Sequence, residues 1–128
     1  MPLPTPENVK SKVKKELAEL NCQNISEKHR KEVAQKIISK LVNFTKPNKM
    51  NKEGIKQQDL NDTVQILHII VDLNIFDSNI RILETANNIL DARNTKSWRN
   101  MKNDKIIRNL TITLEKYGFQ CGESLKND

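Results

Sequence analysis

The sequence is poor in the residues that build loops, aromatic platforms and membrane spans. Its 128 residues are only 4% aromatic and include three glycines, four prolines and two cysteines. So few glycines and prolines exclude a collagen-like or loop-rich chain. The longest apolar run, residues 66–71, is far shorter than the roughly 20 residues that span a bilayer. The first six residues lack the basic start and apolar stretch of a secretory signal. We therefore expect a cytosolic protein, or a fragment of a longer secreted or membrane-anchored one.

Residue patterns that carry catalysis are also missing. The sequence has no nucleophile elbow, no glycine-rich phosphate loop and no HExxH motif. His29 lies in a charged helix start and His68 in an apolar segment, and neither has metal-ligand spacing to a cysteine. We interpret both histidines as structural or solvated. We expect no enzymatic activity, no cofactor and no metal site.

Apolar residues recur with helical spacing along most of the chain, and no segment of useful length has the period of a strand. The sequence predicts one all-α domain over residues 1–128, a bundle of five or six amphipathic helices with a flexible segment at residues 1–6. We expect N-caps at Thr5 and Ser26, and a fourth helix that starts at Asp77 or Ser78. The densest apolar face, between residues 60 and 71, predicts the most central helix. The last helix is expected to end at Gly118, a suitable C′ residue.

The net charge of +6 is unevenly distributed. Residues 1–56 hold 13 basic and 6 acidic residues, whereas residues 57–128 hold 9 basic and 10 acidic ones. Such an excess can attract nucleic acid, heparin-like glycans or anionic lipid headgroups. However, the lysines alternate with glutamates and no aromatic residues accompany them, which favours a solvated helix face. The alternative is a stand-alone basic helical module that binds an acidic partner.

The segment ETANNILDARNTKSWRNM, residues 84–101, contains the only tryptophan. The apolar face that leads into it comprises Ile82, Leu83, Ala86, Ile89 and Leu90. We expect Asn87 at the inner edge of this face, where its amide would bond a neighbouring helix or a helix end. The pattern breaks at residues 91–94. We expect Trp98 to follow on a short second segment and to pack against Leu90 and Ile107.

This segment resembles part of latrophilin-type adhesion G-protein-coupled receptors. The shared order is Glu-Thr-x-Asn-Asn-hydrophobic-Leu, a short polar gap, Trp-Arg-Asn and an amphipathic helix. It is similar to the helical half, subdomain A, of the GAIN domain, best over residues 79–107. The matched positions Asn87, Asn88, Leu90 and Trp98 carry over only as core and helix-packing residues.

The resemblance implies an extracellular module that positions ligand-binding domains and supports the region holding the tethered agonist. Its partners would be the β-rich GAIN half, the membrane-spanning bundle and a cell-surface or matrix protein ligand. The self-cleavage site of the family belongs to the β-rich half, so no cleavage residue carries over. The expected location is the extracellular side of the plasma membrane, as part of a receptor or as a secreted fragment. No specific nucleic acid and no membrane insertion by this chain are expected.

Two further features bear on the compartment. Asn24, Asn43, Asn61 and Asn109 each begin an N-x-S/T sequon. The 16 asparagines and 13 serines and threonines would give about 1.6 sequons by chance, so four are an enrichment. The two cysteines, Cys22 and Cys121, would form a disulfide in an oxidising compartment and remain free thiols in the cytosol. Both possibilities stay open at this point.

Overall fold

The computed structural model describes residues 8–22, 24–47, 54–75, 80–101 and 104–126. These residues form six α-helices, one 3-10 helix and no strand, which confirms the predicted all-α bundle. The elements are α1 (Val9–Leu20), α2 (Glu27–Thr45), α3 (Gln57–Asp72), α4 (Ile82–Ile89), η1 (Ala92–Asn94), α5 (Thr95–Arg99) and α6 (Lys105–Lys126). The predicted flexible segment at residues 1–6, with its cap at Thr5, lies outside the described residues.

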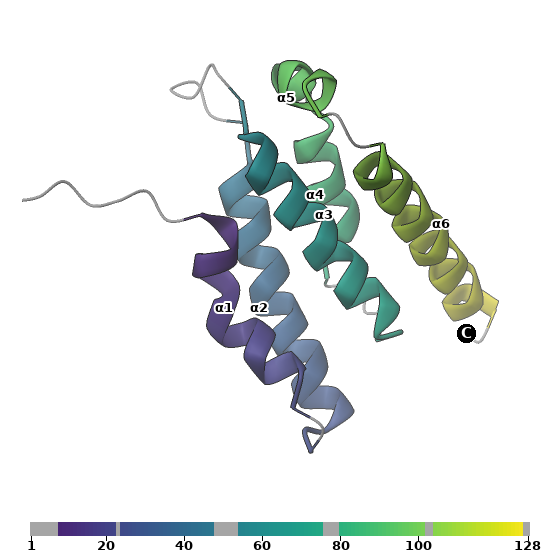
Figure 1. The fold of residues 1–128 in the computed structure, drawn as a ribbon. Coiled ribbons are helices and arrows are strands. Elements are labelled where there is room, and N and C mark those ends of the chain that lie inside the picture. Colours follow the sequence, from purple (N-terminus) through teal and green to yellow (C-terminus); the bar gives the residue numbers. More distant parts are fainter. Residues whose placement is uncertain (1–7, 23, 48–53, 76–79, 102–103, 127–128) are drawn as a thin grey trace, which may run out of the picture.

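The helices pack side by side with α3 at the centre (Figure 1). α1 and α2 form an antiparallel pair along one edge, and α4 packs on α2. α3 contacts α1 on one side and α6 on the other. This confirms the prediction that the helix with the densest apolar face is the most central one. The short α5 lies at one end of the bundle, where it contacts α3. The chain thus brings the end of α2, the start of α3 and the end of α4 to the same region.

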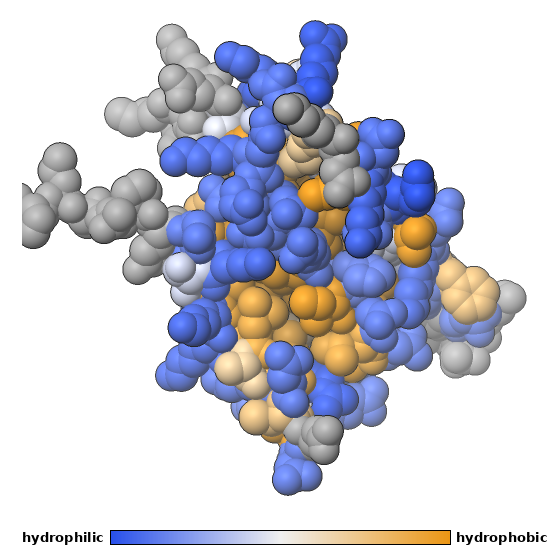
Figure 2. Space-filling view, viewed as in Figure 1, coloured by the Kyte–Doolittle hydropathy of each residue, from blue (hydrophilic) through white to orange (hydrophobic). Residues whose placement is uncertain are grey.

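Isoleucine, leucine and valine fill the core. The largest side chains that are almost fully buried include Ile37, Ile38, Leu41, Leu60, Ile66, Leu67, Ile82 and Ile89. Each such side chain contributes roughly 1.5–3 kcal/mol by leaving water. Figure 2 shows apolar side chains gathered over the lower halves of α1 and α3, with hydrophilic side chains around them. Among the described residues, no helix has the length and apolar character to cross a membrane.

Side-chain N-caps begin α1 and α2, whereas α4 begins without one. Ser26 caps α2 as predicted, because its Oγ accepts a hydrogen bond from the His29 N–H at 3.1 Å. Asn8 caps α1 in the same way. The predicted start of α4 at Asp77 or Ser78 lies outside the described residues, but α4 begins later than predicted, at Ile82, because residues 80 and 81 are not helical. The Ile82 N–H bonds the Ile80 carbonyl at 3.0 Å across a tight turn, and this turn separates α4 from the preceding chain.

The predicted end of the last helix at Gly118 is also wrong. α6 continues to Lys126 and contains both Gly118 and Gly122. Its inner face is held beyond the glycine by Gln120, whose Nε2 donates to the Val71 carbonyl at 2.9 Å and to Asn74 Oδ1 at 3.0 Å. Tertiary contacts with the end of α3 therefore outweigh the roughly 1 kcal/mol penalty of an interior glycine.

Candidate functional site: a helix junction around Asn94

Asn94 is the centre of a network of hydrogen bonds and is completely buried. Its Nδ2 donates to the carbonyl oxygens of Asn88 at 3.1 Å and Ile89 at 3.2 Å. These carbonyls belong to the last turn of α4, where they have no partner within the helix. Its Oδ1 accepts from the Ile55 N–H at 2.8 Å, just before α3. One amide thus ends α4 and fixes the entry to α3.

The short helix α5 adds two further bonds, to the backbone of Ile89 and Ile55. The Trp98 Nε1 donates to the Ile89 carbonyl at 2.7 Å, and the Ser97 hydroxyl donates to the Ile55 carbonyl at 2.6 Å. The tryptophan is half-buried and packs against the core. The chain therefore turns back after α4 and places the indole on the end of the helix it has just left.

Asn88 and Arg93 satisfy the end of α2. The Asn88 Nδ2 lies 3.3 Å from the Val42 carbonyl and 3.2 Å from the Thr45 hydroxyl. The Arg93 Nη2 donates to the Thr45 carbonyl at 2.6 Å. These bonds join segments more than 40 residues apart in the sequence, and they supply partners that the last turn of α2 lacks.

Gly54 makes room for the junction. It has a positive φ of 79°, a conformation that other residues rarely adopt. A Cβ at this position would lie 2.5 Å from the Arg93 carbonyl oxygen and 2.9 Å from Asn94 Oδ1. Only glycine therefore allows the backbone before Ile55 to approach Asn94 closely.

Two of the predictions for this region are wrong. Asn87 is exposed, and its neighbour Asn88 makes the bonds expected of it. Leu83 and Leu90 are 56% and 55% exposed, because the buried face of α4 consists of Ile82, Thr85, Ala86 and Ile89. Ile107 is 46% exposed, and the contact of Trp98 with Leu90 and Ile107 stays a prediction. In α6, Ile106 packs on the core instead.

The junction also contains residues that the sequence did not single out. Asn94, Arg93, Ser97 and Gly54 have no apolar periodicity to mark them. The only signals in the sequence are the break in the helical pattern at residues 91–94 and Gly54, the one glycine before Gly118. Both signals indicate a special backbone, but neither identifies the partner.

One sequon reaches the junction, because Thr45 of the Asn43 sequon accepts hydrogen bonds from Asn88 and Arg93. Asn24 and Asn43 are exposed, in the α1–α2 connection and on α2, whereas Asn61 and Asn109 are half-buried on α3 and α6. Cys22 is an exposed free thiol after α1, and Cys121 is a half-buried free thiol on α6. The disulfide between them stays a prediction.

The histidines and the pocket offer little chemistry. His68 Nδ1 lies 3.1 Å from the Thr113 hydroxyl, and His29 faces Glu19 at 3.5 Å. No group of three or more His, Cys, Asp or Glu side chains that could hold a metal occurs in the described part of the chain.

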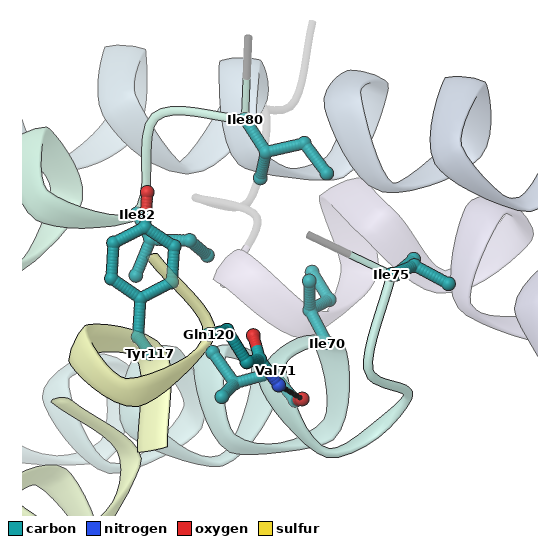
Figure 3. Close-up of a pocket in the computed structure, with 7 residues that line it drawn as sticks. All are labelled: Ile70, Val71, Ile75, Ile80, Ile82, Tyr117 and Gln120. Atoms are coloured by element: carbon teal, nitrogen blue, oxygen red, sulfur yellow. Dashed lines mark hydrogen bonds between the residues drawn. The ribbon is translucent and has the colours of Figure 1, made fainter. Parts of the chain in front are cut away.

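A pocket is lined by Ile70, Val71, Ile75, Ile80, Ile82, Tyr117 and Gln120 (Figure 3). Its free volume of about 10 Å³ has room for one water molecule. Burial raises the pKa of Tyr117, and Cys121 acts in the same direction.

Comparison with known proteins does not place the chain in a family. No family model, curated protein or solved structure matches it. Its function must therefore be inferred from the junction, from the distribution of charge and from the resemblance in residues 84–101.

Proposed function

We propose that the chain is an extracellular helical module of an adhesion-type G-protein-coupled receptor, corresponding to the helical half of a GAIN domain. Its role is structural: it positions neighbouring domains beside the self-cleaving β-rich half. One observation carries the proposal. The residues on which the resemblance rests, 84–101, are those that build the junction at the ends of α2 and α4 and the start of α3.

The chemistry of the junction supports a structural role. The amides of Asn88 and Asn94 and the indole of Trp98 are all engaged with backbone or hydroxyl groups of the chain itself. Buried polar groups that are satisfied in this way fix one arrangement of the helices. A receptor stalk needs such rigidity because it must hold its neighbours in a constant geometry. On this proposal the chain acts without catalysis.

N-glycosylation provides the test of the compartment. The protein is expressed in a mammalian secretory host, and its mass is measured before and after an enzyme that removes N-glycans. We expect a loss of mass that Asn24→Gln and Asn43→Gln together largely abolish, because these two sequon asparagines are exposed. Asn21→Gln, an exposed position outside any sequon, is the control. The absence of glycan at all four sequons would remove the main independent support for an extracellular module.

A second candidate is a stand-alone basic helical module that binds an acidic partner. The observation that favours it is the charge of the α1–α2 pair, where residues 9–45 hold nine basic and four acidic residues. In residues 57–126 the two signs balance at nine each. Binding to nucleic acid that survives physiological salt and prefers one sequence would place this candidate first.

A further inference from the structure

Four lysines of α1 and α2 form one surface, which we call the lysine seam. Lys12 and Lys15 are three residues apart on α1, and Lys36 and Lys40 are four apart on α2, so each pair shares a helix face. The Lys40 Nζ lies 3.4 Å from the Lys12 carbonyl oxygen, which brings the two rows together. All four residues are exposed.

Three acidic residues, Glu16, Glu19 and Glu32, lie near the seam and offset part of its charge. Glu16 bonds the ammonium group of Lys40 from beneath, and its own side chain is only 12% exposed. The hydrogen bond from Lys40 lowers the pKa of Glu16, and the charges of Lys40 and Lys15 act in the same direction. Glu19 and Glu32 both face His29, at 3.5 Å and 4.0 Å. The four lysines of the seam therefore outnumber the three neighbouring carboxylates, of which Glu16 is the least exposed.

We propose that the lysine seam binds a sulfated, heparin-like polysaccharide. Lysine ammonium groups are compact, mobile point charges that suit a chain of separate anionic groups. The exposure of this site to such glycans rests on the proposed extracellular location.

Two observations favour a glycan over other polyanions. The Phe44 ring has the Lys12 ammonium group over one face at 5.0 Å and packs against the core, so it is not a free platform on which a nucleic-acid base could stack. The most exposed large apolar side chains lie on α3, on α4 and its C-cap, and on α6, whereas Leu17 on α1 and Phe44 on α2 are only partly exposed. The seam thus lacks the apolar residues with which membrane-binding helices enter a bilayer.

The test measures binding of the full chain to heparin over a series of salt concentrations. The variant Lys15→Glu/Lys36→Glu reverses two charges of the seam, and neither lysine has an ion pair with a described residue. The control, Lys96→Glu/Arg99→Glu, makes the same change of net charge on exposed positions of α5. Circular dichroism confirms that both variants keep the helical content of the native chain.

We expect the native chain to bind heparin more tightly than a DNA duplex or vesicles of phosphatidylserine and phosphatidylcholine. The seam variant should lose at least about tenfold in affinity for heparin at roughly 0.1 M salt, and the control less than about twofold. Equal losses of affinity in both variants, or no binding of heparin by the native chain, would overturn the proposal that the lysine seam binds a polysaccharide. Tighter binding to the duplex or to the vesicles would overturn the choice of a glycan. None of these results affects the glycosylation test, so the two proposals can fail separately.

Discussion

The amide of Asn94 makes three hydrogen bonds to backbone groups of two separate segments. A carboxylate or an apolar side chain at this position could not both donate to the end of α4 and accept from Ile55. Asn87 has the same side chain but is exposed on α4. Substitutions at the two positions therefore compare the loss of a buried, hydrogen-bonded asparagine with the loss of an exposed one.

We expect Asn94→Ala to lower the free energy of unfolding by roughly 2–5 kcal/mol, because it removes three hydrogen bonds and leaves the Ile55 N–H without a partner. Asn87→Ala should change it by less than about 0.5 kcal/mol, as is usual for exposed positions. Denaturation in urea, followed by circular dichroism, gives both values. Equal midpoints for the two variants would mean that Asn94 has no special part in joining the helices.

At the scale of the elements, the glycines show how context decides the effect of one residue type. Gly54 has a positive φ and lies against Arg93 and Asn94, whereas Gly118 lies inside α6 with open space where a Cβ would stand. The same methyl group should therefore strain the entry to α3 and favour the helical backbone of α6.

We expect Gly54→Ala to destabilise the protein by about 1–3 kcal/mol, through both the positive φ and the close contact. Gly118→Ala should stabilise it by about 0.5–1 kcal/mol, because alanine loses less backbone entropy in a helix. Thermal unfolding of the two variants shows the signs directly. A lower melting temperature for Gly118→Ala would contradict the continuous helix through residue 118.

The elements also show what the sequence can and cannot predict. The existence of the helices, the Ser26 cap and the short segment of Trp98 follow from local periodicity and capping chemistry. The face of α4 does not, because eight residues make only about two turns and contact with α2 decides their rotation. The role of Asn94 could not be predicted either, since its partner Ile55 is 39 residues away.

For the molecule as a whole, the ion pair between Glu16 and Lys40 ties α1 to α2. The pKa of Glu16 lies below its ordinary value of 4.5 in the folded state, chiefly through the hydrogen bond from Lys40. The unfolded chain therefore binds more protons than the folded one as the pH falls. The stabilisation is present above about pH 4.5 and is lost as the pH falls through the folded pKa.

We expect Glu16→Gln to flatten the fall in stability below about pH 4.5. Glu115→Gln removes an exposed carboxylate that has no ion pair with a described residue, and it should leave the profile closer to that of the native chain. Urea denaturation at a series of pH values compares the three proteins. A Glu16→Gln profile that runs parallel to the native one would show that this pair does not link the two helices.

The membership of a larger receptor is the central proposal for the whole molecule, and the reading frame of the full-length transcript tests it most directly. The chain should continue in frame into a β-rich segment, followed by seven apolar segments of about 20 residues each. A stop codon directly after Asp128, or a continuation without apolar segments of that length, would contradict the receptor module.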